Sequence, residues 1–280
     1  MALNFGRSIS FPLTPARSSL SKPRHVRSVS LPCTTSSHPL LVNLHAHIAA
    51  LRCWIQQHPS SSLLSGLTAI QALHSSIADL LLLPECGAAL RCPTSNVADR
   101  LLDAFLLLVD AHRGFHQECL MSLRHAATES HAALRRGDTG RLASAASSQR
   151  RAEKELARLA ASVSAIFPKS TRLNLVAVSG EEAEMAYALV EAAAASAVAF
   201  AALFSAAASM SSTASTSKKT ATFIPAFARR AATAPEIAEA TVERCLDECD
   251  GFCDMVFRSV VQTRVSLLNI MTPAIYSLHS

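Results

Sequence analysis

NVADRLLDAFLLLVDAHRGFHQEC, residues 96–119, has the apolar spacing of one long amphipathic helix. Side chains that suit a buried stripe recur every three or four residues, which places them on one side of a helix. Asn96 is expected to cap its start, and the pattern persists to about Arg136, just before Gly137. A helix of about 40 residues would be on the order of 60 Å long, so it needs long neighbours to cover its stripe. The stripe consists of Leu101, Phe105, Leu108, His112, Phe115 and Cys119.

The segments on either side carry the same kind of spacing, and none of them predicts a strand. The stretch PECGAALRCP, residues 84–93, lies between two prolines and is expected to be a connector. The sequence therefore predicts an all-α fold: an elongated antiparallel bundle of long helices with a disordered N-terminal tail. The predicted helices cover residues 41–55, 63–80, 96–136, 141–167, 179–204 and 235–271.

Composition divides the chain into four predicted parts. Residues 1–39 are basic and rich in Ser and Pro, which predicts a disordered tail. Residues 40–204 are expected to form the helical bundle, and 205–234 a Ser/Thr/Ala-rich linker with a basic patch. Residues 235–272 predict a long C-terminal helix that packs on the bundle. The net charge is +5, and no acidic residue precedes Asp79, so the excess marks a basic tail and no nucleic-acid-binding domain.

Cysteine usage and the N-terminus bear on the compartment. The chain has 8 cysteines, scattered along a large helical sequence that lacks the apolar core of a secretory signal. This pattern favours reduced thiols inside the cell, and we expect a cytoplasmic protein. A tail rich in Ser and Arg and free of acid is also typical of a transit peptide, so a plastid or a mitochondrion is the alternative.

The strongest functional signal is RHVRSVSLP, residues 24–32. Arg27 lies three residues before Ser30, which is the spacing that basophilic kinases use. The stretch RSVSLP also matches the phosphoserine motif that 14-3-3 proteins bind. Short Arg/Ser motifs also arise by chance in basic tails. The candidate phosphorylation and docking residues are Arg24, Arg27, Ser28, Ser30 and Pro32.

Other clusters have simpler structural interpretations. Cys245, Cys249 and Cys253 recur every fourth residue, and we expect them to pack in the core, although a neighbouring pair could share a zinc ion. His112 and His116 have the same spacing and could hold a metal ion, but they lack the glutamate of the zinc-protease motif, and His112 is expected to be a hydrogen-bonded core residue. Phosphate-binding, dinucleotide-binding and nucleophile-elbow motifs are absent from the sequence. We therefore predict no catalytic, metal or cofactor site and no enzyme activity.

Residues 192–217 contain no charged side chain and are long enough to cross a bilayer. Most of them are Ala or Ser, which gain little from a lipid environment, so a buried bundle helix is the expected structure. Membrane association remains the alternative, because the patch that follows holds cationic and apolar side chains. The cations are Lys218, Lys219, Arg229 and Arg230.

Four separated segments resemble a plant-specific family of BYPASS-type helical proteins associated with root and shoot development. This resemblance implies no enzymatic activity and supplies no catalytic residues. Together with the tail motif, it implies a regulator or scaffold that acts through protein contacts, with a 14-3-3 protein and a basophilic kinase as partners. Self-association through the long apolar stripes, or a membrane-associated developmental factor, are the alternatives. The segments are HVRSVSLP (25–32), SHPLL (37–41), ALHSSIADLLLLP (72–84) and VFRSVVQTRVSLLNIMT (256–272).

Overall fold

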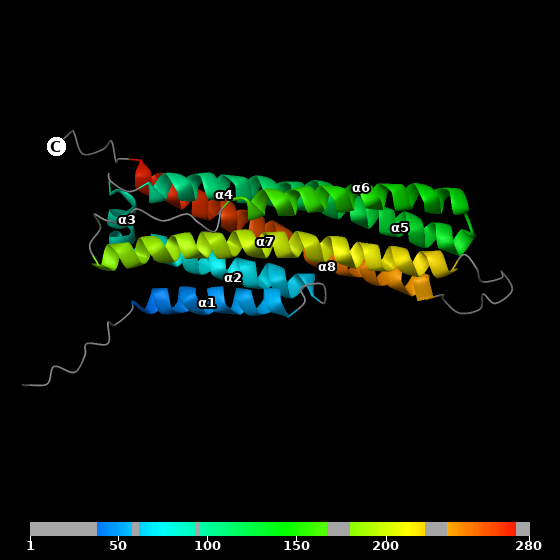
Figure 1. Cartoon of the computed structure of the whole chain (residues 1–280), viewed down its shortest axis with the longest axis horizontal. Helices are drawn as coiled ribbons and strands as arrows, with labels where there is room; N and C mark the ends of the chain where they lie inside the picture. Colours follow the sequence, from blue (N-terminus) through cyan, green and yellow to red (C-terminus); the bar gives the residue numbers. More distant parts are fainter. Residues whose placement is uncertain (1–37, 58–61, 93–95, 167–179, 222–233, 273–280) are drawn as a thin grey trace, which may run out of the picture. The chain divides into compact units, whose positions relative to one another are not determined.

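The computed structural model describes residues 38–57, 62–92, 96–166, 180–221 and 234–272, and it describes the side chains of these residues except 214–221 and 234–236. Within these ranges the chain forms eight α-helices and one π-helical turn and contains no strand, which confirms the all-α prediction (Figure 1). Successive long helices run in opposite directions and lie side by side (Figure 1).

The first two helices form a hairpin. α1 spans Pro39–Gln56, and its start is capped by the His38 ring, whose Nδ1 accepts a hydrogen bond from the Leu40 amide. α2 spans Leu63–Leu81 and is capped by Ser62. The Trp54 ring packs directly on Gly66: a Cβ atom at residue 66 would lie 2.2 Å from the Cζ2 atom of Trp54. The side chain of Trp54 therefore requires glycine at this position.

The expected connector at residues 84–93 is partly helical. α3 spans Pro84–Leu90, with Pro84 at a position where the missing N–H is not needed and Glu85 in the first turn. Cys86, Ala89 and Leu90 are buried against the bundle. Burial of these side chains stabilises a short helix. The flanking prolines had predicted a connector here instead.

The long central helix is present as predicted, but it is not α-helical throughout. α4 (Val97–Arg113), a π-helical turn η2 (Gly114–Leu120) and α5 (Met121–Arg136) follow one another without a break. Asn96 stands at the N-cap, but its side chain makes no capping hydrogen bond there, contrary to expectation. Gly137 ends α5 with φ of 70°, a left-handed conformation that favours glycine.

α6 (Thr139–Ser164) folds back along α5 after a turn of two residues, and Asp138 caps it by accepting the Arg141 amide hydrogen at 3.0 Å. α7 spans Gly180–Ala221 and is longer than expected, because residues 205–221 were assigned to a linker. Alanine has the highest intrinsic helix propensity. Phe204 and its neighbours pack in the core, and Gln149 of α6 donates to the backbone oxygen of Ser211 at 2.6 Å. These contacts extend α7 beyond the predicted end.

α7 is the central helix of the bundle, with neighbours on α1, α2, α3, α4, α6 and α8 (Figure 1). Its segment Gly180–Thr213 is long and apolar enough to span a membrane, with a mean hydropathy of 1.8 over 18 residues. Within the described chain, no other single helix is both long enough and apolar enough to span a membrane. The pair α2 and α3, bent by 89° at the break between them, is long and apolar enough only when the two are taken together. Because 67% of the apolar window in α7 is buried, the protein interior accounts for its composition.

α8 spans Ala234–Met271, close to the predicted bounds, and packs against α2, α4, α5 and α7. Cys249 and Cys253 are fully buried in this interface, as expected of small core side chains. The acidic first half of α8 faces α5. Arg124 pairs with Asp247 at 3.0 Å, and the Thr128 hydroxyl donates to Glu243 at 2.7 Å. The acidic side chains therefore contribute to helix packing as well as complementing the helix dipole.

Candidate functional site

The docking residues predicted from the sequence, Arg24, Arg27, Ser28, Ser30 and Pro32, lie outside the described residues. The phosphorylation and docking site therefore stays a prediction from the sequence. Six residues lie between Pro32 and Pro39, where α1 begins.

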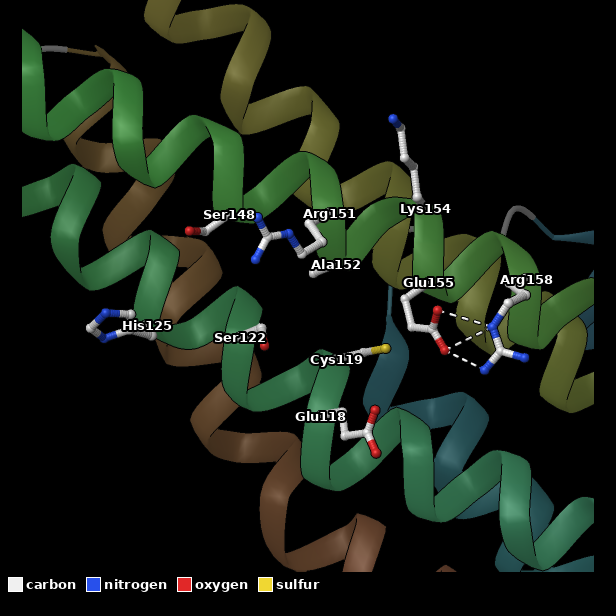
Figure 2. A pocket seen from close by; sticks show the side chains of 10 residues that line it. All are labelled: Glu118, Cys119, Ser122, His125, Ser148, Arg151, Ala152, Lys154, Glu155 and Arg158. Atoms are coloured by element: carbon white, nitrogen blue, oxygen red, sulfur yellow. Dashed lines mark hydrogen bonds and ion pairs between the residues drawn. The ribbon is translucent and has the colours of Figure 1, made fainter.

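A groove runs along the surface between η2–α5 and α6, with a volume of about 590 Å³ (Figure 2). One wall comes from the end of the π-helical turn and the first part of α5, and the other from the middle of α6. Its size falls within the range of about 300–1,000 Å³ that is typical of small-molecule sites. The residues that line it are Glu118, Cys119, Ser122, His125, Ser148, Arg151, Ala152, Lys154, Glu155 and Arg158.

The floor of the groove is apolar, and its one thiol is not a nucleophile near neutral pH. Cys119 and Ala152 are both buried. Burial, followed by the nearby charges of Glu155 and Glu118, raises the pKa of the Cys119 thiol to about 12. The thiol therefore stays protonated near neutral pH, whereas a cysteine nucleophile acts as a thiolate.

The rim of the groove is charged. The Arg158 guanidinium binds both carboxylate oxygens of Glu155, and its Nε lies 2.9 and 3.0 Å from them (Figure 2). These hydrogen bonds hold the pKa of Glu155 below its usual value. Arg151 and Lys154 form no ion pair with a described residue, and Glu118 forms none directly, although its charge adds to the hydrogen bonds and charge of Glu155 in raising the pKa of Arg158. The groove thus combines one internally neutralised pair with two available cations and one available carboxylate.

The π-helical turn places Glu118 and Cys119 at the groove. A π turn adds one residue to a helical turn and displaces the residues that follow it around the helix axis, and such turns are common at functional sites. Nothing in the apolar spacing of residues 96–136 signalled this turn, because its buried residues Phe115 and Cys119 still fit the stripe. The groove was therefore missed by sequence reasoning.

His112 occupies the core position that the sequence predicted. Its Nε2 donates a hydrogen bond to the Cys253 backbone oxygen at 2.9 Å, and its Nδ1 has no partner among the described atoms. Burial lowers the pKa of His112 to about 4, against the opposing effect of the Cys253 hydrogen bond. His116 lies beside it and binds Asp250 at 2.8 Å. Within the described ranges, no group of three or more metal-ligating side chains comes together.

A second buried histidine, His74 of α2, was not singled out from the sequence. Its Nε2 lies 3.1 Å from the Ser196 hydroxyl on α7, and its Nδ1 lies 3.5 Å from the Thr263 hydroxyl on α8. Burial, followed by the charge of His112, lowers the pKa of His74 to about 3. The only feature of the sequence that could have indicated its burial is its position next to Leu73 on the apolar side of α2. His74 joins three helices through polar contacts inside the core.

The three cysteines in the row on α8 differ in exposure and in the direction of their pKa shifts. A hydrogen bond with Cys249 lowers the pKa of Cys245 to about 7, and Cys245 is partly exposed. Burial raises the pKa of Cys253 to about 12. The row is therefore mainly core packing, as expected, and Cys245 is the member whose pKa is lowered and whose thiol is partly exposed.

The chain matches the family model described as Protein BPS1 over residues 66–240 and 238–270. No curated protein matches, and no solved structure matches. The matched residues cover the bundle from α2 to the end of α8, and they include the groove. Residues 24–32 lie outside the match. Because the match covers well over half of the chain, the protein belongs to the Protein BPS1 family.

Proposed function

We propose that the protein is a non-enzymatic scaffold or regulator of root and shoot development in a plant, acting through protein–protein contacts. The observation that carries this proposal is the RSVSLP motif at residues 27–32, placed shortly before the helical bundle. Phosphorylation of Ser30 by a basophilic kinase would create a docking site for a 14-3-3 protein in the cytoplasm. The developmental role is what the resemblance to BYPASS-type proteins implies, and the chain's membership of the Protein BPS1 family is consistent with that resemblance.

The chemistry of the motif supports a switch controlled by phosphate. Phosphorylation adds about two negative charges and three strong acceptor oxygens to the Ser30 side chain. Arginine clusters bind such groups through bidentate, charge-assisted hydrogen bonds. The guanidinium of Arg27 and the ring of Pro32 flank Ser30 at the positions that a 14-3-3 groove reads. We therefore expect docking to require the phosphate itself.

A comparative pull-down from plant lysate tests the proposal. The baits are the wild-type chain, the Ser30→Ala variant and the matched control Ser36→Ala, all kept with phosphatase inhibitors. We expect the wild type and Ser36→Ala to retain a 14-3-3 protein and a shared set of partners, and Ser30→Ala to lose them. Equal recovery by all three baits would refute the docking site.

Membrane association is the second candidate function, and the length and hydropathy of α7 favour it. The burial of that helix opposes it, because insertion would require the bundle to open. Flotation with anionic liposomes separates the two candidates. A scaffold stays with the soluble fraction in the absence of detergent, whereas a membrane-anchored factor floats with the liposomes.

A further inference from the structure

We propose that the groove between η2–α5 and α6 binds a phosphorylated polyol, either free or as a lipid headgroup such as that of a phosphoinositide. The inference rests on the charges and hydroxyls around the groove and does not depend on the Ser30 motif. Its volume of about 590 Å³ accommodates a ligand of this size.

The charge of the groove favours an anion. Its rim carries three fixed cations, Arg151, Lys154 and Arg158, against two carboxylates. Glu155 already neutralises Arg158, so Arg151 and Lys154 remain available to a ligand. Figure 2 shows the Arg151 guanidinium extending from α6 beside Ser148, whereas the Lys154 side chain points away from Cys119 and Glu118, so its ammonium reaches a ligand in the groove only when its flexible stem rotates. Guanidinium and ammonium groups are the side chains that bind phosphate oxygens most often.

The remaining rim groups favour a ligand that also carries hydroxyls. Ser122 and Ser148 are exposed, and no hydrogen bond with a described residue occupies their hydroxyls. Glu118 offers a carboxylate without an ion-pair partner in the described chain, and a carboxylate accepts hydrogen bonds from hydroxyl groups. A bare phosphate would gain nothing from Glu118 and would be repelled by it. A polyol that carries phosphates can satisfy Glu118 with its hydroxyls and the two free cations with its phosphates.

The position of the groove on rigid elements supports a preformed site. Its walls are two antiparallel helices joined by a turn of two residues, and its floor is the buried pair Cys119 and Ala152. The Arg158–Glu155 contact holds one wall side chain in place before any ligand arrives. Binding therefore requires the ordering of few groups, mainly the side chains of Arg151 and Lys154.

Isothermal titration of the full chain with inositol trisphosphate tests the inference. The Arg151→Gln/Lys154→Gln variant is compared with Arg135→Gln/Arg136→Gln, which removes the same charge from exposed positions at the end of α5. We expect about tenfold weaker binding for the groove variant, which corresponds to a loss of roughly 1.4 kcal/mol, and little change for the control. Circular dichroism confirms that both variants are folded. No binding to the wild type, or equal weakening in both variants, would overturn the proposal.

Two further arms identify the ligand class. We expect inorganic phosphate to bind more weakly than inositol trisphosphate, and Glu118→Gln to reduce that preference. Phosphate binding as tight as that of the polyol would contradict the assignment of a polyol. Flotation with phosphatidylcholine vesicles, with and without phosphatidylinositol bisphosphate, separates the sources: selective flotation identifies a lipid headgroup, and titration without flotation identifies a free polyol. Failure of these tests leaves the Ser30 proposal unaffected.

Discussion

Acid should destabilise the bundle through its two buried histidines. His74 and His112 are both fully buried, and their pKa values in the folded protein are lowered from 6.5 to about 3 and about 4. The unfolded chain therefore binds more protons than the folded chain once the pH falls below 6.5. Stability is complete above that pH and is lost progressively as the pH falls towards 4 and 3.

The size of the effect follows from the pKa shifts. For each histidine that stays neutral in the folded state, lowering the pH to one unit below the unfolded pKa reduces the free energy of unfolding by about 1.4 kcal/mol. At about pH 5 each histidine therefore costs roughly 2 kcal/mol, and the two together roughly 4 kcal/mol. This estimate does not depend on the folded values in detail, because both lie below that pH. A loss of this size is a large part of the 5–15 kcal/mol that typically stabilises a domain.

Urea unfolding followed by circular dichroism at about pH 7.5 and about pH 5 measures the effect. The variants are His74→Asn, His112→Gln and, as an exposed control, His125→Gln. Each core variant loses some stability at neutral pH, but the readout is the difference between the two pH values. We expect that difference to shrink by roughly 2 kcal/mol in each core variant and to be unchanged in the control. A wild-type difference that persists undiminished in both core variants would refute the reasoning.

Two glycines and two cysteines elsewhere carry further predictions. Gly66→Ala forces the Trp54 ring to move, so we expect a loss of about 1–2 kcal/mol in urea unfolding despite the better helix propensity of alanine. Gly251→Ala is the matched change in α8, where an added Cβ meets no atom within 4 Å, and we expect a gain of about 0.5–1 kcal/mol; a gain in both would contradict the packing of Trp54. Cys245 should be alkylated by iodoacetamide faster than Cys253 in peptide mapping by mass spectrometry, and its rate should fall as the pH drops below about 7. Equal rates for the two thiols would contradict the assigned pKa shifts.

The helical architecture could be predicted because its signal is local. Apolar residues at three- and four-residue intervals, such as Leu101, Phe105 and Leu108, fit only one face of a helix, and all of them are buried. The ends of helices were harder to predict. α7 extends past Phe204 because Gln149 of α6 contacts Ser211, and a contact between residues so far apart leaves no local pattern.

The groove could not be predicted, for the same reason. Its walls belong to α5 and α6, and the register of two helices depends on the turn at Gly137 and on the packing of many side chains. The π-helical turn is a second obstacle, because it shifts Glu118 around the axis without disturbing the apolar spacing. His112 was predicted correctly as a core residue, since it lies on the stripe. Its hydrogen-bond partner, the Cys253 backbone oxygen, could not be predicted, because the two groups come together only through the packing of α4 against α8.

The most direct test of the central claim is a titration of purified 14-3-3 protein with the full chain, phosphorylated at Ser30 by a basophilic kinase. The unphosphorylated chain and the Ser30→Ala chain treated with the same kinase are the controls. The account predicts saturable binding only for the chain that carries phosphate at Ser30. Binding that is equal for all three chains, or absent from the phosphorylated one, would contradict it.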